Sequence, residues 1–194
     1  MAACSPCSPR PRRGPGSVRV GLVASAIAVA AVSVACSRAD PTTTVTLADG
    51  AGPALPATVT ATVDGDTVDL RFADGHTDRA RLLGVDTPET VHPDRPVDCF
   101  GPEASAQTDA LLPAGTPVLV QRDAEARDRY GRLLVYLWRK DDGLFVNASL
   151  VADGYARTLS IAPNDAHRVE LSAAAAEART AGRGLWGRCP EEDP

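Results

Sequence analysis

Aromatic residues are scarce in this chain of 194 residues, in which Phe, Trp and Tyr together make up 4%. Hydrophobic residues nevertheless account for 44%, so Val, Leu and Ala must fill the core of the folded part. The sequence also lacks an internal repeat, which excludes a repeat array. Its length suits a single domain once an N-terminal leader is set aside.

Positive charge is not in excess either. The chain has 20 Lys and Arg residues against 25 Asp and Glu residues, for a net charge of −5 at pH 7. Residues 1–35 contain arginines but no acid, so the remainder is more acidic than the whole. A protein that coats nucleic acid without specificity is basic, and this class is therefore excluded. Any polyanion bound here needs a local basic site or a metal.

Cysteines beyond the leader form no CxxC motif and no nearby Cys/His pair, which argues against a zinc site. Of the five cysteines, Cys4 and Cys7 belong to the leader and Cys36 follows it directly. Cys99 and Cys189 remain, and outside the cytoplasm two such residues are expected to form a disulfide. Two free buried thiols are the alternative.

The N-terminus has the pattern of an export signal. An Arg-rich stretch precedes the apolar residues 20–35, a run that is short for a membrane span, and small residues lead to Cys36. Residues 33–36 resemble the lipobox of bacterial lipoproteins, which predicts a lipid-anchored N-terminus at Cys36. Plain secretion and an uncleaved N-terminal anchor are the alternatives. In each case we expect an extracytoplasmic protein.

The remaining chain divides by composition. Residues 36–57 are rich in Thr, Ala, Pro and Gly and predict a flexible tether, residues 58–190 form the folded domain, and residues 191–194 are a tail. Alternating or short apolar segments predict five strands, at residues 58–63, 68–72, 77–85, 117–122 and 133–138. Helical patterns with Pro or Asn near the start and Gly at the end predict helices at residues 102–112, 146–153 and 165–181.

The chemistry concentrates at the end of the third predicted strand. Arg81 precedes an apolar run, and Pro88 forces a bend that separates Asp86 from Glu89. Asp66 follows a hairpin turn on a neighbouring strand, so its carboxylate can converge with that of Asp86. Two carboxylates and a guanidinium suit a hard cation, a phosphate and a water. A charged strand end followed by an ordinary turn is the alternative.

Four segments then appear together in order. Residues 63–68, 81–90, 101–105 and 128–132 have the sequences and approximate spacing of staphylococcal nuclease-like proteins, the thermonuclease family. The resemblance extends over about residues 58–187. It implies an α+β fold, namely a five-stranded OB-type barrel with three helices.

The resemblance also implies a metal site and a base. Asp66, Asp86 and the carbonyl of Thr87 would bind one Ca²⁺, a hard cation that prefers oxygen ligands. Glu89 would position or deprotonate the attacking water.

Phosphate contacts are implied in the same way. Arg81 and Arg132 would grip the scissile phosphate with paired donors. Tyr130, and with it Arg129, would contact the neighbouring phosphate. The implied activity is hydrolysis of DNA and RNA to 3′-phosphates, and we expect a monomer. A non-catalytic OB-fold module that binds nucleic acid is the alternative, and a structural lipoprotein domain that binds Ca²⁺ only for stability is another.

One segment departs from the family pattern. Residues 157–164 contain no tyrosine, although relatives place aromatic rings there. Ser160 and Ala162 occupy this region, so stacking of a base is not expected from it.

Overall fold

The computed structural model describes residues 52–90 and 96–190. The predicted signal peptide, the lipidation site at Cys36 and the C-terminal tail lie outside these residues. Among the helices that are described, none is both long enough and apolar enough to cross a lipid bilayer.

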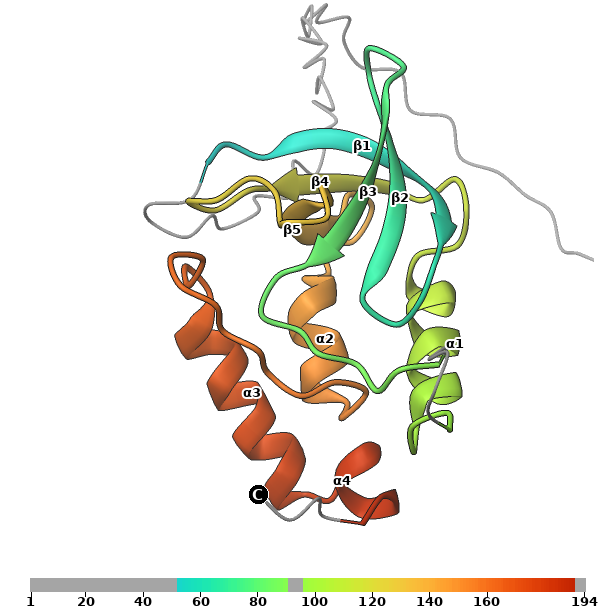
Figure 1. Cartoon of the computed structure of the whole chain (residues 1–194), viewed down its shortest axis with the longest axis vertical. Helices are drawn as coiled ribbons and strands as arrows, with labels where there is room; N and C mark the ends of the chain where they lie inside the picture. The colour runs from blue at the N-terminus through green and yellow to red at the C-terminus, as the bar shows by residue number, and fades with distance from the viewer. Residues whose placement is uncertain (1–51, 91–95, 191–194) are drawn as a thin grey trace, which may run out of the picture. The chain divides into compact units, whose positions relative to one another are not determined.

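A closed barrel of five strands carries the rest of the domain (Figure 1). The strands are β1 (Leu55–Thr62), β2 (Thr67–Phe72), β3 (Thr77–Leu82), β4 (Pro117–Gln121) and β5 (Leu133–Arg139). Around the barrel they follow the order β1-β2-β3-β5-β4, and β1 pairs with β4 to close it. β3 and β5 are parallel and the other pairs are antiparallel. The predicted fold class, α+β with an OB-type barrel, is thereby confirmed.

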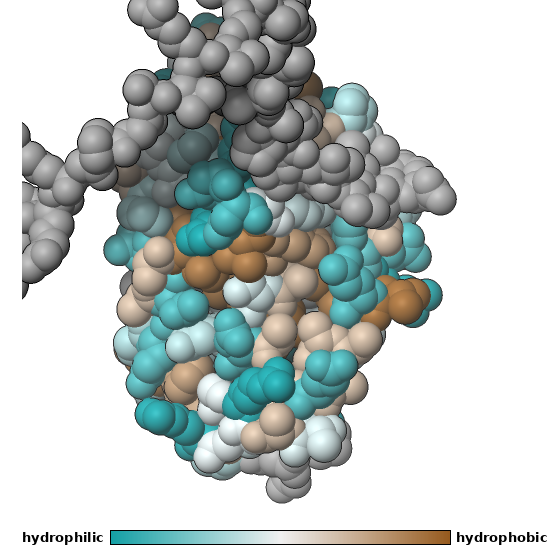
Figure 2. All heavy atoms as spheres, turned by 180° about the vertical axis from the view of Figure 1, so that it is seen from behind, coloured by the Kyte–Doolittle hydropathy of each residue, from teal (hydrophilic) through white to brown (hydrophobic). Residues whose placement is uncertain are grey.

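Aliphatic side chains fill the interior, as the scarcity of aromatic residues requires. Val68 and Leu70 on β2 are fully buried, and so are Val135 and Leu137 on β5. Seen from behind, hydrophobic residues gather in a band across the middle of a mostly polar face (Figure 2). Buried aliphatic residues alternate along β2 at Val68 and Leu70, whereas β5 is buried continuously from Val135 to Trp138.

Helices cover one end of the barrel, with α2 (Val146–Ala152) between α1 (Gly101–Leu111) and α3 (Arg168–Thr180) in Figure 1. The buried side chain of Asn147 fastens α2 to the sheet. It accepts a hydrogen bond from the Leu137 N–H (3.0 Å) and donates to the carbonyls of Leu83 (2.9 Å) and Val135 (3.3 Å). A short α4 (Leu185–Arg188) follows α3 and was not expected from the sequence.

Three boundaries differ from the prediction for physical reasons. β1 begins at Leu55, inside the predicted tether, because residues 55–57 pair with β4. β3 ends at Leu82, because Gly84 turns the chain with φ of 73° and lies against Leu171 of α3, where a side chain would collide. α3 begins at Arg168, because the Asn164 side chain does not cap it. Asn164 instead bonds the backbone of Glu125, accepting from its N–H at 2.8 Å.

A disulfide joins Cys99 to Cys189, with 5.8 Å between the Cα atoms. Cys99 precedes α1 and Cys189 follows α4, so the bond links the two ends of the helical part of the domain. Without this disulfide, only noncovalent contacts would connect these two ends.

Candidate active site

The pairing of β2 with β3 brings Asp66 to Arg81. Thr67 is opposite Arg81 in the register, and the Leu82 N–H donates to the Asp66 carbonyl at 2.8 Å. The Arg81 guanidinium forms an ion pair with Asp66 through Nη1 and with Asp86 through Nη2, the latter at 3.3 Å. The Arg81 side chain is only 16% exposed, so this pairing takes place largely out of water.

The buried carboxylate of Asp66 has a partner at each oxygen. Its Oδ1 accepts from the Thr67 hydroxyl at 3.1 Å. Its Oδ2 accepts from the Thr87 hydroxyl at 3.1 Å and from the Thr87 N–H at 3.3 Å, in addition to Arg81. A buried carboxylate is tolerated only when it is satisfied in this way.

Asp86 is placed by the backbone rather than by a strand of the barrel. Its N–H donates to the Arg157 carbonyl at 2.9 Å, and the Arg157 N–H donates to the Asp86 carbonyl at 2.8 Å. This two-way pairing holds the segment after β3 against the chain that follows α2. The Asp86 carboxylate is half exposed and faces Arg81, so its remaining oxygen positions are open to a ligand.

Arg132 lies on the side of β5, the second strand that pairs with β3. Arg81 is opposite Leu134 of β5, and Arg132 directly precedes that strand. Asp128 fixes Arg132 by accepting from its N–H at 2.9 Å and from its Nε at 2.7 Å. Burial acts to raise the pKa of Asp128, but the hydrogen bonds from Arg132 and Tyr130 outweigh it and lower that pKa.

Burial and several neighbouring charges act on the pKa of Arg81. Burial lowers the pKa of Arg81, the negative charges of Asp86 and Glu89 act to raise it, and the positive charge of Arg132 acts to lower it. Arginine remains protonated in all these surroundings, since its ordinary pKa is above 12. The charges of both Arg132 and Glu89 therefore influence Arg81.

A groove of about 510 Å³ opens beside this cluster. Arg81, Arg129 and Arg132 line it together with Tyr130, which is 69% exposed. The guanidinium carbon of Arg129 lies 4.7 Å from the centre of the Tyr130 ring and that of Arg132 lies 5.6 Å from it. The groove thus combines cations with one exposed aromatic face.

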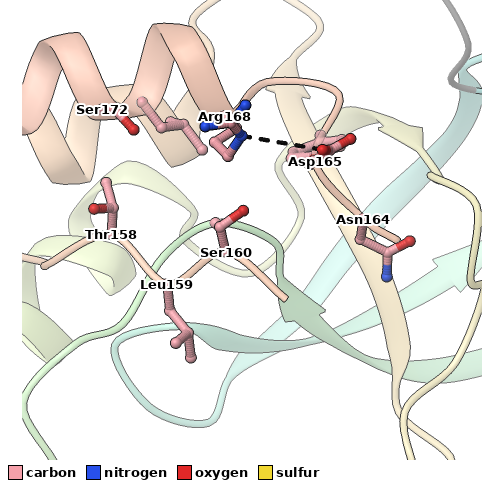
Figure 3. Close-up of a pocket in the computed structure, with 10 residues that line it drawn as sticks. Thr158, Leu159, Ser160, Asn164, Asp165, Arg168 and Ser172 are labelled. Carbon is pink, nitrogen blue, oxygen red and sulfur yellow. Dashed lines mark ion pairs between the residues drawn. The ribbon is translucent and has the colours of Figure 1, made fainter. Parts of the chain in front are cut away.

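Leu159 and Ile161 form the opposite, apolar part of the groove, with exposed fractions of 41% and 62%. Ser160 and Ala162, the positions named from the sequence for this region, are not among the residues that line the groove. Figure 3 shows Ser160 directed toward Asp165 and Arg168 at the start of α3, whereas Leu159 points to the other side of its segment. Because side chains alternate along an extended segment, the aliphatic residues are the ones that meet the groove.

The structure thus joins Asp66, Arg81, Asp86 and Thr87 through direct contacts. Arg129, Tyr130 and Arg132 line the adjoining groove, and Glu89 lies within electrostatic reach of Arg81. Within residues 52–90 and 96–190, no three His, Cys, Asp or Glu side chains are grouped closely enough to hold a metal ion by themselves. A cation here would need backbone and external oxygens as well.

Sequence reasoning missed the residues that support the site. Asp128 holds Arg132, and its place four residues before Arg132 was the available signal. Leu159 and Ile161 were signalled by their alternation with polar residues. Asp98 contacts the backbone of Glu89 and had no signal in the sequence.

Comparison with known proteins gives consistent results. The family described as staphylococcal nuclease homologue matches residues 79–188. A thermonuclease of Staphylococcus intermedius is 40% identical over 126 residues, which cover 65% of this chain and 73% of that protein. A thermonuclease of Staphylococcus hyicus is 36% identical, covering 64% of this chain and 71% of its own length. Endonuclease YhcR of Bacillus subtilis (strain 168) is 37% identical over 68% of this chain but only 11% of its own length.

The ion pair of Arg81 with buried Asp66 generates a prediction about stability. Replacing Arg81 by Ala leaves a buried carboxylate without its cation, so the free energy of unfolding should fall by about 3 kcal/mol. Adding Asp66→Asn to that variant should recover part of the loss, because the uncompensated charge is removed. Urea unfolding of the two single variants and the double variant measures this.

Arg79→Ala is the matched control. Arg79 lies two positions away on β3 and pairs with Asp69, but its side chain is 53% exposed. Its removal should therefore cost much less than that of Arg81. Equal losses for the two arginines would contradict the assigned role of burial.

Proposed function

Because this chain belongs to the staphylococcal nuclease family, we propose that it hydrolyses phosphodiester bonds of DNA and RNA, with Ca²⁺ and with little sequence specificity. The observation that carries the proposal is the Arg81 guanidinium held between Asp66 and Asp86 at the mouth of the groove. Fixed cations, oxygen donors for a metal and a nearby carboxylate are the groups that such hydrolysis needs.

The donors at Asp66, Asp86 and the Thr87 carbonyl fit Ca²⁺. All are oxygens, and both carboxylates reach one guanidinium, so they lie close together. Ca²⁺ takes ~6–8 oxygen ligands, which leaves positions for water and a phosphate oxygen. When bound, the ion polarises the phosphoryl group and lowers the pKa of a bound water.

Arg81 and Arg132 act on the phosphate. Negative charge builds on the equatorial oxygens as water attacks, and a guanidinium offers those oxygens paired donors. The partners already described hold both side chains in place, so little reorganisation accompanies the reaction. Arg129 and Tyr130 are placed along the same groove to contact the next phosphate.

Glu89 serves as the base. Its carboxylate is exposed beyond the bend at Pro88, where water can reach it. It accepts a proton from the attacking water, whose oxygen forms the new bond to phosphorus. The bond from phosphorus to the 5′-oxygen breaks, the leaving oxygen takes a proton from solvent, and a 3′-phosphate remains.

Bases are held by contacts that carry little sequence information. Leu159 and Ile161 offer an apolar surface where relatives place rings, but an aliphatic side chain does not stack on a base as an aromatic one does. Binding then rests mainly on phosphate contacts, which position the substrate without reading its sequence.

The location proposed for this nuclease is outside the cytoplasm. The export pattern of residues 1–35 and the disulfide both favour an oxidising compartment. Lipid at Cys36 would attach the nuclease to a membrane surface, and plain secretion would release it.

Cleavage of plasmid DNA tests the proposed function. The protein should convert supercoiled plasmid and total RNA to fragments when Ca²⁺ is present, and a chelator should abolish this. Binding to nucleic acid without cleavage would instead support a binding module. Stabilisation by Ca²⁺ without either would support a structural domain.

Substitutions at the base and at one arginine should separate chemistry from binding. Glu89→Gln and Arg132→Ala should each lower kcat by about 100-fold or more, because both act mainly in the transition state. KM should change less for Glu89→Gln than for Arg132→Ala. Glu103→Gln, an exposed change on α1, is the matched control and should retain full turnover.

The apolar side of the groove can be tested with tyrosine. Leu159→Tyr or Ile161→Tyr should strengthen binding of a short oligonucleotide in Ca²⁺ by ~1–3 kcal/mol, the usual range for stacking a base. Ser160→Tyr is the control, since Ser160 faces α3 and not the groove (Figure 3). Fluorescence anisotropy measures Kd, and a gain from Ser160→Tyr alone would mean that the groove is not the base site.

The N-terminus of the exported protein can be determined by intact mass. Loss of residues 1–35 together with added acyl mass is the expected result for a lipoprotein. A mature form that begins after Cys36 and carries no lipid would support plain secretion.

A further inference from the structure

Glu89 is held at its backbone from both sides by one residue. The Glu89 N–H donates to Oδ2 of Asp98 at 3.1 Å, and the Asp98 N–H donates to the Glu89 carbonyl at 3.0 Å. The two residues are nine positions apart in the sequence, so these bonds join two separate segments of the described chain. Asp98 therefore restrains the backbone conformation of Glu89.

Residues 98–101, which we call the clamp turn, are themselves well defined. The Gly101 N–H donates to the Asp98 carbonyl at 3.1 Å. Phe100 adopts a left-handed conformation with φ of 70°, and its buried ring lies 5.4 Å from that of Tyr155. Gly101 lies so close to Glu89 that an added Cβ would be 2.8 Å from the Glu89 carbonyl oxygen. The clamp turn thus packs directly on the Glu89 backbone.

The disulfide attaches the clamp turn to the end of the helical layer. Cys99 lies inside the turn and bonds to Cys189, directly after α4. α4 is anchored by Leu185, which is buried and whose N–H donates to the Gly154 carbonyl at 2.9 Å. Asp98 and Cys99 are exposed, so without this covalent bond the turn would be held by the packing of Phe100 and by hydrogen bonds that compete with water.

We propose that the clamp turn and its disulfide position Glu89 for catalysis, with Asp98 as the positioning residue. The inference rests on the proposed role of Glu89 as the base. A base must lie within hydrogen-bond reach of the water whose proton it takes, and a displacement of about 1 Å can cost ~100-fold in rate. Glu89 stands beyond the end of β3, where no barrel hydrogen bond can fix it, so the clamp turn supplies that rigidity.

Variants of Asp98 test the hydrogen bond. Asp98→Ala removes the acceptor for the Glu89 N–H, and kcat should fall roughly 10- to 100-fold while KM changes little. Asp98→Asn keeps a carbonyl acceptor at the same place and should recover most of the lost turnover. Asp109→Ala, an exposed change on α1, is the matched control and should leave kcat unchanged.

The disulfide is tested with the double variant Cys99→Ser/Cys189→Ser and with reductant. Both the double variant and dithiothreitol-treated wild type should show a lower kcat at a temperature where each remains folded by circular dichroism. The double variant should not respond to reductant. A lower melting temperature with unchanged kcat would show that the bond serves stability alone and would overturn its positioning role.

Amide exchange distinguishes failure of this inference from failure of the proposed function. The Glu89 N–H should exchange faster in Asp98→Ala than in wild type or Asp98→Asn, whether or not the protein cleaves nucleic acid. If wild type is inactive but this exchange pattern holds, the proposed function is wrong and the clamp remains. If wild type is active and Asp98→Ala matches it in kcat and in exchange, the clamp is wrong.

Discussion

The ion pair of Arg81 with Asp66 is the contact on which the rest of the site depends. Asp66 is buried at the start of β2, and a buried charge without a partner costs several kcal/mol. Arg81 on β3 meets that requirement and, through Asp86, also fixes the chain beyond β3. Arg81 and Asp66 are therefore structural as well as part of the proposed site, and their pairing is set when β2 and β3 pair.

A protein with a net charge of −5 must attract a polyanion locally. Three arginines face one groove, namely Arg81, Arg129 and Arg132, but acidic partners neutralise part of their charge. In the proposed function, long-range steering of nucleic acid would accordingly be weak, and binding would rely on short-range contacts and on a cation at the carboxylates. Contacts of that kind are sensitive to salt, because each phosphate contact releases counterions.

The sequence was sufficient for the barrel and for the central cluster because both depend on local patterns. Alternation predicted the strands, and the pairing of β2 with β3 brings Asp66 to Arg81, which also pairs with Asp86 just beyond β3. The sequence was insufficient where a side chain contacts a residue that is distant in the chain. Asn164 was expected to cap the third helix, but its side chain bonds the backbone of Glu125. Asp98 contacts the backbone of Glu89 from nine positions away in the sequence.

The groove shows the same limit in another form. The absence of tyrosine from residues 157–164 was plain from the sequence, but the residues that replace the rings were not. Alternation separates Leu159 and Ile161 from Ser160, but only the direction of the side chains in the fold decides which of the two faces lines the groove. A register error of one residue exchanges the two faces of an extended segment.

The groups proposed for catalysis differ in how they gain rigidity, and this difference follows from where each lies in the fold. Arg81 lies on β3, where ladder hydrogen bonds fix its backbone, and Arg132 directly precedes β5, where Asp128 bonds both its N–H and its carbonyl. Glu89 lies past the bend at Pro88, beyond the ladder, and its backbone is fixed instead by Asp98 and Gly101. Groups that stabilise charge benefit most from preorganisation, and the barrel supplies it at no extra cost in ordering. The proposed base needs a separate support, which we assign to the clamp turn with its disulfide.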